Sequence, residues 1–77
     1  MRTLICTLTF LDGKTVTAKA ASRSKEDVVP VTYAGDASRL KPFAEKGTLG
    51  FLEWYFQSCA SNTAADIIMK LEGEFED

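Results

Sequence analysis

Acidic side chains crowd the C-terminal end of this chain and are its first candidates for chemistry. Four carboxylates lie close together, at Glu72, Glu74, Glu76 and Asp77. Paired carboxylates act as general acid and base only inside a pocket that sets them apart from solvent, and solvent surrounds a chain terminus. We therefore expect these side chains to act as charge, either by keeping the protein soluble or by contacting a basic surface.

The other residue types that catalysis usually needs are scarce. The chain contains no histidine, the commonest general base and metal ligand. Cys6 and Cys59 are far apart in sequence, whereas zinc sites use paired ligands at short spacing and a nucleophilic cysteine needs a neighbouring base. The five glycines are scattered singly, so no phosphate-binding loop is present. We expect no enzyme, no metal and no cofactor, and we interpret both cysteines as small buried hydrophobic residues.

Charge is divided unevenly along the chain, although the net charge is only −2. Residues 1–46 carry eight Lys or Arg against five Asp or Glu, and residues 47–77 carry one against six. The basic part suggests one alternative, a weak nucleic-acid binder through residues 14–46, but interleaved acids and a pI near 5.0 argue for a solvated loop of mixed charge. The residues concerned are Lys14, Lys19, Arg23, Lys25, Arg39, Lys41 and Lys46, with Tyr33 and Phe43 among them.

Length and composition indicate one small folded unit. With 77 residues there is room for a single domain, which we place over residues 1–77. Threonines interrupt the apolar residues 1–10 and no small-residue cleavage site follows, so this segment predicts a strand and not a signal peptide. No apolar run approaches the ~20 residues that span a bilayer, and two cysteines are too few for a disulfide scaffold. We expect a cytoplasmic protein.

Residues 2–21 predict an antiparallel hairpin. Apolar residues occupy alternate positions in both strands: Leu4, Cys6, Leu8 and Phe10 in the first, and Val16, Ala18 and Ala20 in the second. A two-residue loop at Asp12-Gly13 would place these two sets on opposite faces. A three-residue loop over residues 11–13, with Gly13 in the left-handed conformation, aligns them on one face with Leu8 across from Val16, Cys6 from Ala18 and Leu4 from Ala20. We predict the three-residue loop.

Residues 22–47 allow two interpretations. Ser24 and Asp27 resemble the capping residues of a single helical turn that Pro30 would stop. Alternatively, residues 28–33 form a third strand, in which Pro30 requires a sheet edge or a bulge because it has no N–H. We favour the strand. After a turn at Gly35-Asp36, residues 38–46 form either a short helix or an irregular loop.

An aromatic cluster follows within a predicted helix. Thr48 is a suitable N-cap for a helix that runs through about Cys59. On a helical wheel, one broad arc contains Leu49, Leu52, Tyr55, Phe56 and Cys59. Trp54 lies roughly 160° from Leu52 and off this arc, with Phe51 beside it. Either other elements bury Trp54, or the helix is covered on one side only and Trp54 and Phe51 form an exposed patch for a partner.

A second helix is predicted from Thr63, which with Asp66 resembles a capping box. An apolar stripe at helical spacing follows, made of Ala64, Ile67, Ile68, Leu71 and Phe75. Met69 lies off this stripe beside Glu72 and Glu76, which would repel each other on a helix and oppose its dipole. The resulting fold class is α+β: a small antiparallel β-sheet, the N-terminal hairpin plus one or two further strands, packed against two C-terminal α-helices.

The stretch Leu52-Glu53-Trp54-Tyr55-Phe56, after a hairpin turned by glycine, resembles small phage-encoded inhibitor proteins, above all anti-CRISPR proteins of type I systems. Some of these combine a sheet of short strands with two helices and open the first helix with a Leu-Glu-x-Trp-Phe-like stretch, whereas here Trp54 follows Glu53 directly. The resemblance covers the architecture and this one stretch. It implies a short, non-enzymatic protein in the host cytoplasm that occupies a surface of a host nucleic-acid-binding complex.

The sequence thus predicts a non-enzymatic protein-binding domain, with an inhibitor of a host CRISPR-Cas type I complex as its most concrete form. The predicted partner-binding residues are Phe51, Trp54, Met69, Glu72, Glu74, Glu76 and Asp77. The main alternative is a small homodimeric structural protein in which the aromatic patch closes the dimer. Contact with a membrane is not expected.

Overall fold

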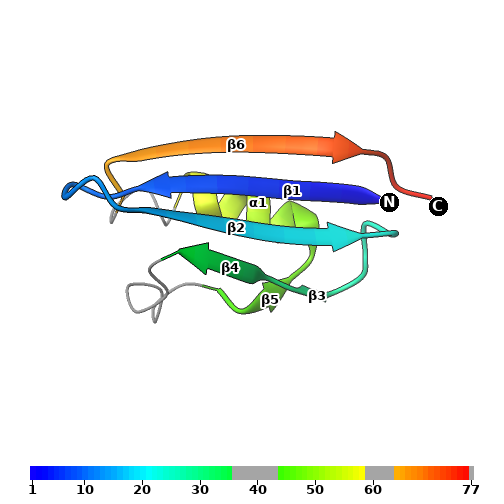
Figure 1. Ribbon diagram of the computed structural model, residues 1–77. Helices are drawn as coiled ribbons and strands as arrows, with labels where there is room; N and C mark the ends of the chain where they lie inside the picture. The colour runs from blue at the N-terminus through cyan, green and yellow to red at the C-terminus, as the bar shows by residue number, and fades with distance from the viewer. Residues whose placement is uncertain (36–43, 59–63, 77) are drawn as a thin grey trace.

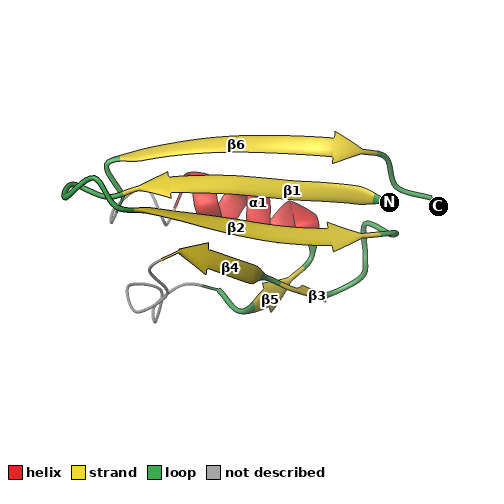
Figure 2. Ribbon diagram, viewed as in Figure 1, coloured by secondary structure: helices red, strands yellow, loops and turns green. Residues whose placement is uncertain are grey.

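The computed structural model describes residues 1–35, 44–58 and 64–76. An antiparallel sheet in the order β4-β2-β1-β6 forms one layer, and a single helix packs on one of its faces (Figures 1 and 2). Its strands are β1 (Arg2–Thr9), β2 (Thr15–Ser22), β4 (Thr32–Gly35) and β6 (Asp66–Gly73). The helix is α1 (Leu49–Ser58), and a second, two-stranded sheet pairs β3 (Val29–Pro30) with β5 (Lys46–Gly47).

The hairpin between β1 and β2 has the predicted three-residue loop. Leu8 lies across from Val16, Cys6 from Ala18 and Leu4 from Ala20. The Phe10 N–H donates to the Lys14 carbonyl oxygen and the Gly13 N–H to the Phe10 carbonyl oxygen, each over 2.9 Å. Gly13 has a φ of +85°, the left-handed conformation that a glycine adopts without strain. The predicted register is confirmed.

The predicted third strand is present, but it is divided at Val31. Before the break, β3 pairs with β5, and the Val31 N–H donates to the Glu45 carbonyl oxygen over 2.9 Å. After the break, β4 pairs with β2 and places Tyr33 across from Ala18. Pro30 thus lies in a strand of two residues, where a missing N–H is tolerated. Most of residues 38–46, for which a helix and a loop were open, lies outside the described residues.

Helix α1 begins where Thr48 predicts it. The Phe51 N–H donates to Thr48 Oγ1 over 3.2 Å, which satisfies one of the N–H groups that a helix start leaves unpaired. From the predicted inward arc, Leu49, Leu52 and Phe56 are buried and Tyr55 is half-buried, while Cys59 lies outside the described residues. The predicted first helix is confirmed over Leu49–Ser58.

The predicted second helix is wrong, because the chain forms strand β6 there. This strand pairs antiparallel with β1 along its whole length, with Leu4 across from Leu71 and Thr9 across from Asp66. Ile67 and Ile68 are β-branched and suit a strand, and β1 needs a partner at the edge that β2 leaves free. Pairing with a distant strand therefore overrides the local helical spacing. The fold is α+β with one described helix where two were expected.

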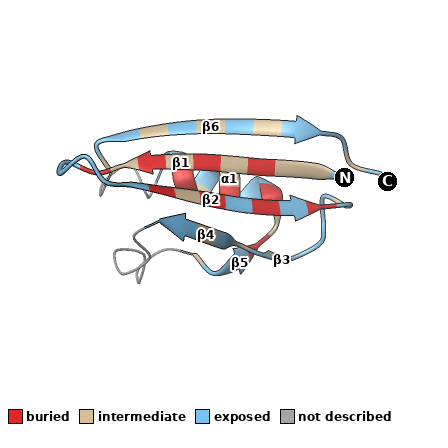
Figure 3. Ribbon diagram, viewed as in Figure 1, coloured by how far each residue is buried: buried red, intermediate tan, exposed pale blue. Residues whose placement is uncertain are grey.

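The core lies between α1 and the helix-facing side of β1 and β2 (Figure 3). Alanines at positions 18 and 20 let the helix lie close to β2, and larger side chains fill the space around them. The buried hydrophobic residues are Leu4, Cys6, Leu8, Phe10, Val16, Ala18, Ala20, Leu49, Leu52 and Phe56. No described element covers the opposite face of the sheet, where the threonines of β1 and β2 alternate with the core residues.

Candidate functional site

Two aromatic side chains are exposed on α1, on the side away from the sheet. Phe51 is 43% exposed and Trp54 is 55% exposed, and their ring centroids are 5.9 Å apart. They point away from the sheet because Leu49, Leu52 and Phe56 occupy the helix positions that face it. The sequence left open whether Trp54 is buried by other elements or exposed, and in the structure it is exposed. We call Phe51 and Trp54 the aromatic patch.

Ring contacts connect the aromatic patch to the core. The Phe51 ring lies 6.0 Å from Tyr55, Tyr55 lies 5.5 Å from Phe56, and Phe56 lies 6.5 Å from Tyr33, all between ring centroids. The last two pairs meet edge to face, an arrangement that contributes about 0.5–1.5 kcal/mol beyond the buried area. The Phe51 ring is therefore packed against Tyr55, which in turn packs against the buried Phe56. Sequence reasoning had assigned Tyr55 only to the core.

Tyr33 supports this chain of rings from strand β4. Its hydroxyl donates to the carbonyl oxygen of Ala44, which ties β4 to the segment before β5. Burial, with smaller contributions from the charges of Tyr55, Cys6 and Glu45, raises the pKa of Tyr33 to about 12.

Burial likewise raises the pKa of the Cys6 thiol to about 11, so that little reactive thiolate forms at neutral pH. The packing role predicted for Cys6 is confirmed, and Cys59 lies outside the described residues.

The predicted acidic residues do not form one surface with the aromatic patch. Glu72 lies on the face of β6 opposite the helix, with its Oε1 atom 3.4 Å from Lys70 Nζ. Met69, its predicted neighbour, lies on the helix side of β6, where Gln57 Nε2 is 3.7 Å from its sulfur atom. Glu74 is exposed, and Asp77 lies outside the described residues. The repulsion expected between Glu72 and Glu76 does not arise, because it required a helix.

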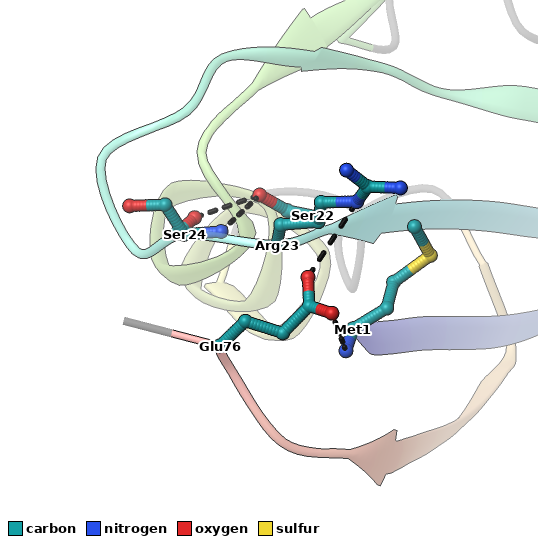
Figure 4. Close-up of polar contacts among 5 residues, drawn as sticks. All are labelled: Met1, Ser22, Arg23, Ser24 and Glu76. Carbon is teal, nitrogen blue, oxygen red and sulfur yellow. Dashed lines mark hydrogen bonds and ion pairs between the residues drawn. The ribbon is translucent and has the colours of Figure 1, made fainter.

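Glu76 holds the end of the described chain against the start of β1 and the end of β2 (Figure 4). Its carboxylate lies 3.5 Å from Arg23 Nε and 4.0 Å from the amino group of Met1, and its N–H donates to the Arg23 carbonyl oxygen over 2.8 Å. Beside it, the Ser22 hydroxyl donates to the Ser24 carbonyl oxygen over 2.7 Å and closes the turn after β2. Glu76 thus has partners within the chain.

Two cavities lie between α1 and β6, which sequence reasoning missed because it expected a helix in place of β6. One, of about 400 Å³, is lined by Leu49 and Glu53 of α1, by Leu71 and Phe75, and by Arg2, Lys25 and Gly50. The other, of about 330 Å³, is lined by Gln57 of α1 and by Ala64, Ala65, Asp66, Ile67 and Met69. The helix therefore covers β1 and β2 but leaves the helix side of β6 half open.

The basic residues of the nucleic-acid alternative are spread over the molecule. Lys14 lies between the hairpin loop and the start of β2, and Arg23 and Lys25 follow the other end of that strand. Arg39, Lys41 and Phe43 lie outside the described residues. Within residues 1–35, 44–58 and 64–76, no three Cys, Asp or Glu side chains gather closely enough to hold a metal ion. In the same part of the chain, no helix is long and apolar enough to cross a membrane.

Comparisons with protein family models, curated proteins and solved structures find no match to this chain. The likeness to anti-CRISPR proteins therefore stays a prediction from sequence.

Proposed function

We propose that this chain is a non-enzymatic protein-binding domain and that its partner protein docks on the aromatic patch. The observation that carries the proposal is the exposure of Phe51 and Trp54, neighbouring rings that are 43% and 55% exposed on one side of α1. Adjacent exposed aromatic side chains on a small domain are typical of protein interfaces, where Trp is enriched among the residues that dominate binding energy.

Packing within the chain explains only part of the patch, because the Phe51 ring lies against Gly47 of β5 while Trp54 stays 55% exposed. The inward side of α1 is complete with Leu49, Leu52 and Phe56, so neither Phe51 nor Trp54 is needed to cover the sheet. The ring contacts through Tyr55 to the core also order the patch before a partner arrives. Binding then costs less side-chain entropy than it would for freely moving rings.

The acidic residues have a secondary place in this proposal. Glu72 and Glu76 already have ion-pair partners within the chain, at Lys70 and at Arg23 with the amino group of Met1. Both pairs are solvent-exposed, so their charge is still felt by an approaching basic surface. An inhibitor that covers the nucleic-acid-binding surface of a host CRISPR-Cas complex is one form of such a domain. That form stays a prediction.

The test compares variants of single exposed side chains in capturing a partner from the native host. The partner is captured with four tagged proteins: the wild type, Phe51→Ala, Trp54→Ala and Leu11→Ala. The captured partner is then purified, and its affinity for each of the four is measured by titration. Leu11 is the control, because it is apolar and 93% exposed but lies in the hairpin loop. We expect Trp54→Ala to lose about 2 kcal/mol or more of binding free energy, and Leu11→Ala to bind as wild type.

Equal affinity of wild type and Trp54→Ala for the partner would contradict the proposed use of the patch.

A second series reverses the charges of Glu72, Glu74 and Glu76 together. Loss of affinity in this series, steeper at low salt, is expected if the partner surface is basic. Unchanged affinity would show that the acidic residues do not contact the partner. The proposal that the partner docks on the aromatic patch would not be affected.

A further inference from the structure

Strand β6 forms an edge of the main sheet, and its outer side is open. Within the described residues no strand pairs with that side, and Figure 1 shows nothing beyond it. The strand is eight residues long, and its third residue, Ile68, is 63% exposed. A long edge with an exposed apolar residue tends to pair with another strand, and proteins discourage such pairing with proline, bulges or charged side chains. The charges of β6 have both signs, at Asp66, Lys70 and Glu72, so they favour a partner strand of complementary charge.

We propose that β6 pairs antiparallel with β6 of a second copy of this chain, around a twofold axis that passes through Ile68. The two four-stranded sheets then become one sheet of eight strands, with both helices on the same side. A twofold axis of this kind is perpendicular to the sheet and pairs only residues whose side chains lie on the same face.

The residues of β6 are self-complementary in this register. On the face away from the helix, Asp66 lies opposite Lys70 of the second copy, Lys70 opposite its Asp66, and Ile68 opposite its Ile68. On the helix side, the half-buried Ile67 and Met69 lie opposite each other. Each dimer thus gains two cross-strand pairs of opposite charge around an apolar centre, and both kinds of pair stabilise sheets.

Neighbouring positions of the axis give poorer pairs. An axis at Met69 places Asp66 opposite Glu72, and an axis at Lys70 places two lysines opposite each other. An axis at Leu71 pairs Lys70 with Glu72 but leaves both Asp66 and the exposed Ile68 outside the paired part of β6. An axis at Ile67 leaves Asp66 opposite Ile68. Within β6, only the axis at Ile68 pairs Asp66 with Lys70 and places the two exposed isoleucines opposite each other. The third charged residue of the strand, Glu72, then lies opposite Ala64, which precedes β6.

The cavity beside Gln57 fits the same arrangement. It holds about 330 Å³, and its lining includes Ala65, just before β6, and Ile67 and Met69 on the helix side of β6. In the proposed register, Met69 of the second copy lies opposite Ile67, and its Leu71 lies opposite Ala65. Apolar side chains of the second copy therefore come to the open side of this cavity. The aromatic patch takes no part in this pairing, because Phe51 and Trp54 lie on the side of α1 away from the sheet.

The experiment measures the oligomeric state of the purified full chain by sedimentation over a wide concentration range. Wild type is compared with Asp66→Lys, Lys70→Asp and the double variant Asp66→Lys/Lys70→Asp. Each single variant places like charges opposite each other twice per dimer, so we expect its dimer dissociation constant to rise by about tenfold or more. The double variant restores both pairs and the dimer. The control Ala34→Lys adds a charge to the other edge strand, β4, and leaves dimerisation unchanged.

A mixture of the two single variants provides the sharpest result. The Asp66→Lys chain has lysine at both positions 66 and 70, and the Lys70→Asp chain has aspartate at both. In the proposed register, each lysine of one chain therefore lies opposite an aspartate of the other. We expect a heterodimer tighter than either homodimer. Circular dichroism spectra matching wild type show that each variant is folded.

Three results would overturn the proposal. The first is a wild-type chain that stays monomeric at all concentrations. The second is single variants that dimerise as wild type does, which would place the interface elsewhere. The third is a dimer that Lys70→Asp weakens and Asp66→Lys leaves unchanged, which is what the axis at Leu71 requires, because that axis pairs Lys70 with Glu72 and not with Asp66.

Discussion

The ring of Phe51 packs against Gly47, so closely that a Cβ atom on Gly47 would lie 2.6 Å from its Cδ2 atom. Gly47 is buried in β5, two residues before α1 begins. The absence of a side chain there gives the Phe51 ring its place beside Trp54. The orientation of the aromatic patch thus depends on a residue that belongs neither to the patch nor to the helix.

Replacing Gly47 by alanine is expected to displace the Phe51 ring. The new methyl group overlaps the ring and also comes within 3.5 Å of Leu52 Cδ2, so we expect a loss of about 1–2 kcal/mol in the free energy of unfolding, measured with urea. The control is Gly50→Ala, because a Cβ atom there meets nothing within 4 Å. That variant is expected to gain about 0.5–1 kcal/mol, since alanine suits a helix better than glycine. Equal effects of the two variants would contradict the contact.

The fluorescence of Trp54 tests the exposure of the patch directly, because the chain contains a single tryptophan. With the indole 55% exposed, we expect a neutral quencher such as acrylamide to reach it almost as well in the native protein as in urea. Phe51→Ala removes the neighbouring ring and should raise the native quenching constant further. Strong protection of the native protein from quenching would show that Trp54 is covered, either within the chain or by a second copy. Dilution separates these two cases.

The hairpin and α1 could be predicted from sequence because local patterns determine them. Strict alternation on both sides of the loop leaves one register that collects Leu8 and Val16 on the same face, and Gly13 supplies the left-handed residue that this register needs. Thr48 likewise marks the start of a helix through its own hydroxyl group. Neither inference depends on distant parts of the chain.

Strand β6 could not be predicted in the same way, because two periodicities fit its sequence. Ile67, Ile68 and Leu71 follow helical spacing, while Ile67, Met69 and Leu71 alternate with Asp66 and Lys70 as in a strand. The free edge of β1 decides between them, and β1 lies some 60 residues away in sequence. The helical wheel likewise predicts that Trp54 points away from the inward arc. It does not predict whether Trp54 is buried, because that depends on which distant elements pack against this side of the helix.

Alkaline pH is expected to destabilise the fold. Burial raises the pKa of Cys6 from 9.0 to about 11 and that of Tyr33 from 10.0 to about 12. Between these values the unfolded chain has released protons that the folded chain still binds, so the free energy of unfolding falls as the pH rises from 9 to about 12. Urea unfolding at a series of pH values measures this slope. Cys6→Ala should flatten it in the lower half of the range and Tyr33→Phe in the upper half. An unchanged slope in both variants would assign the effect to other groups.

Two glycines in the left-handed conformation should differ in what they tolerate. Gly13 has a φ of +85° with open space around it, and Gly73 has a φ of +79° with the carbonyl oxygen of Met1 where a Cβ atom would lie. Arg2 Nη1 also donates to the Gly73 carbonyl oxygen over 3.1 Å, so this corner joins the end of β6 to the start of β1.

Gly13→Ala should therefore cost only the strain of the conformation, about 1–2 kcal/mol. Gly73→Ala adds a clash with backbone that cannot rotate away, so the start of β1 must separate from β6, and we expect the larger loss of stability. Urea unfolding compares the two variants, and hydrogen exchange locates the loosened amide groups at the ends of β1 and β6. A Gly73→Ala variant as stable as Gly13→Ala would mean that β6 does not close against Met1.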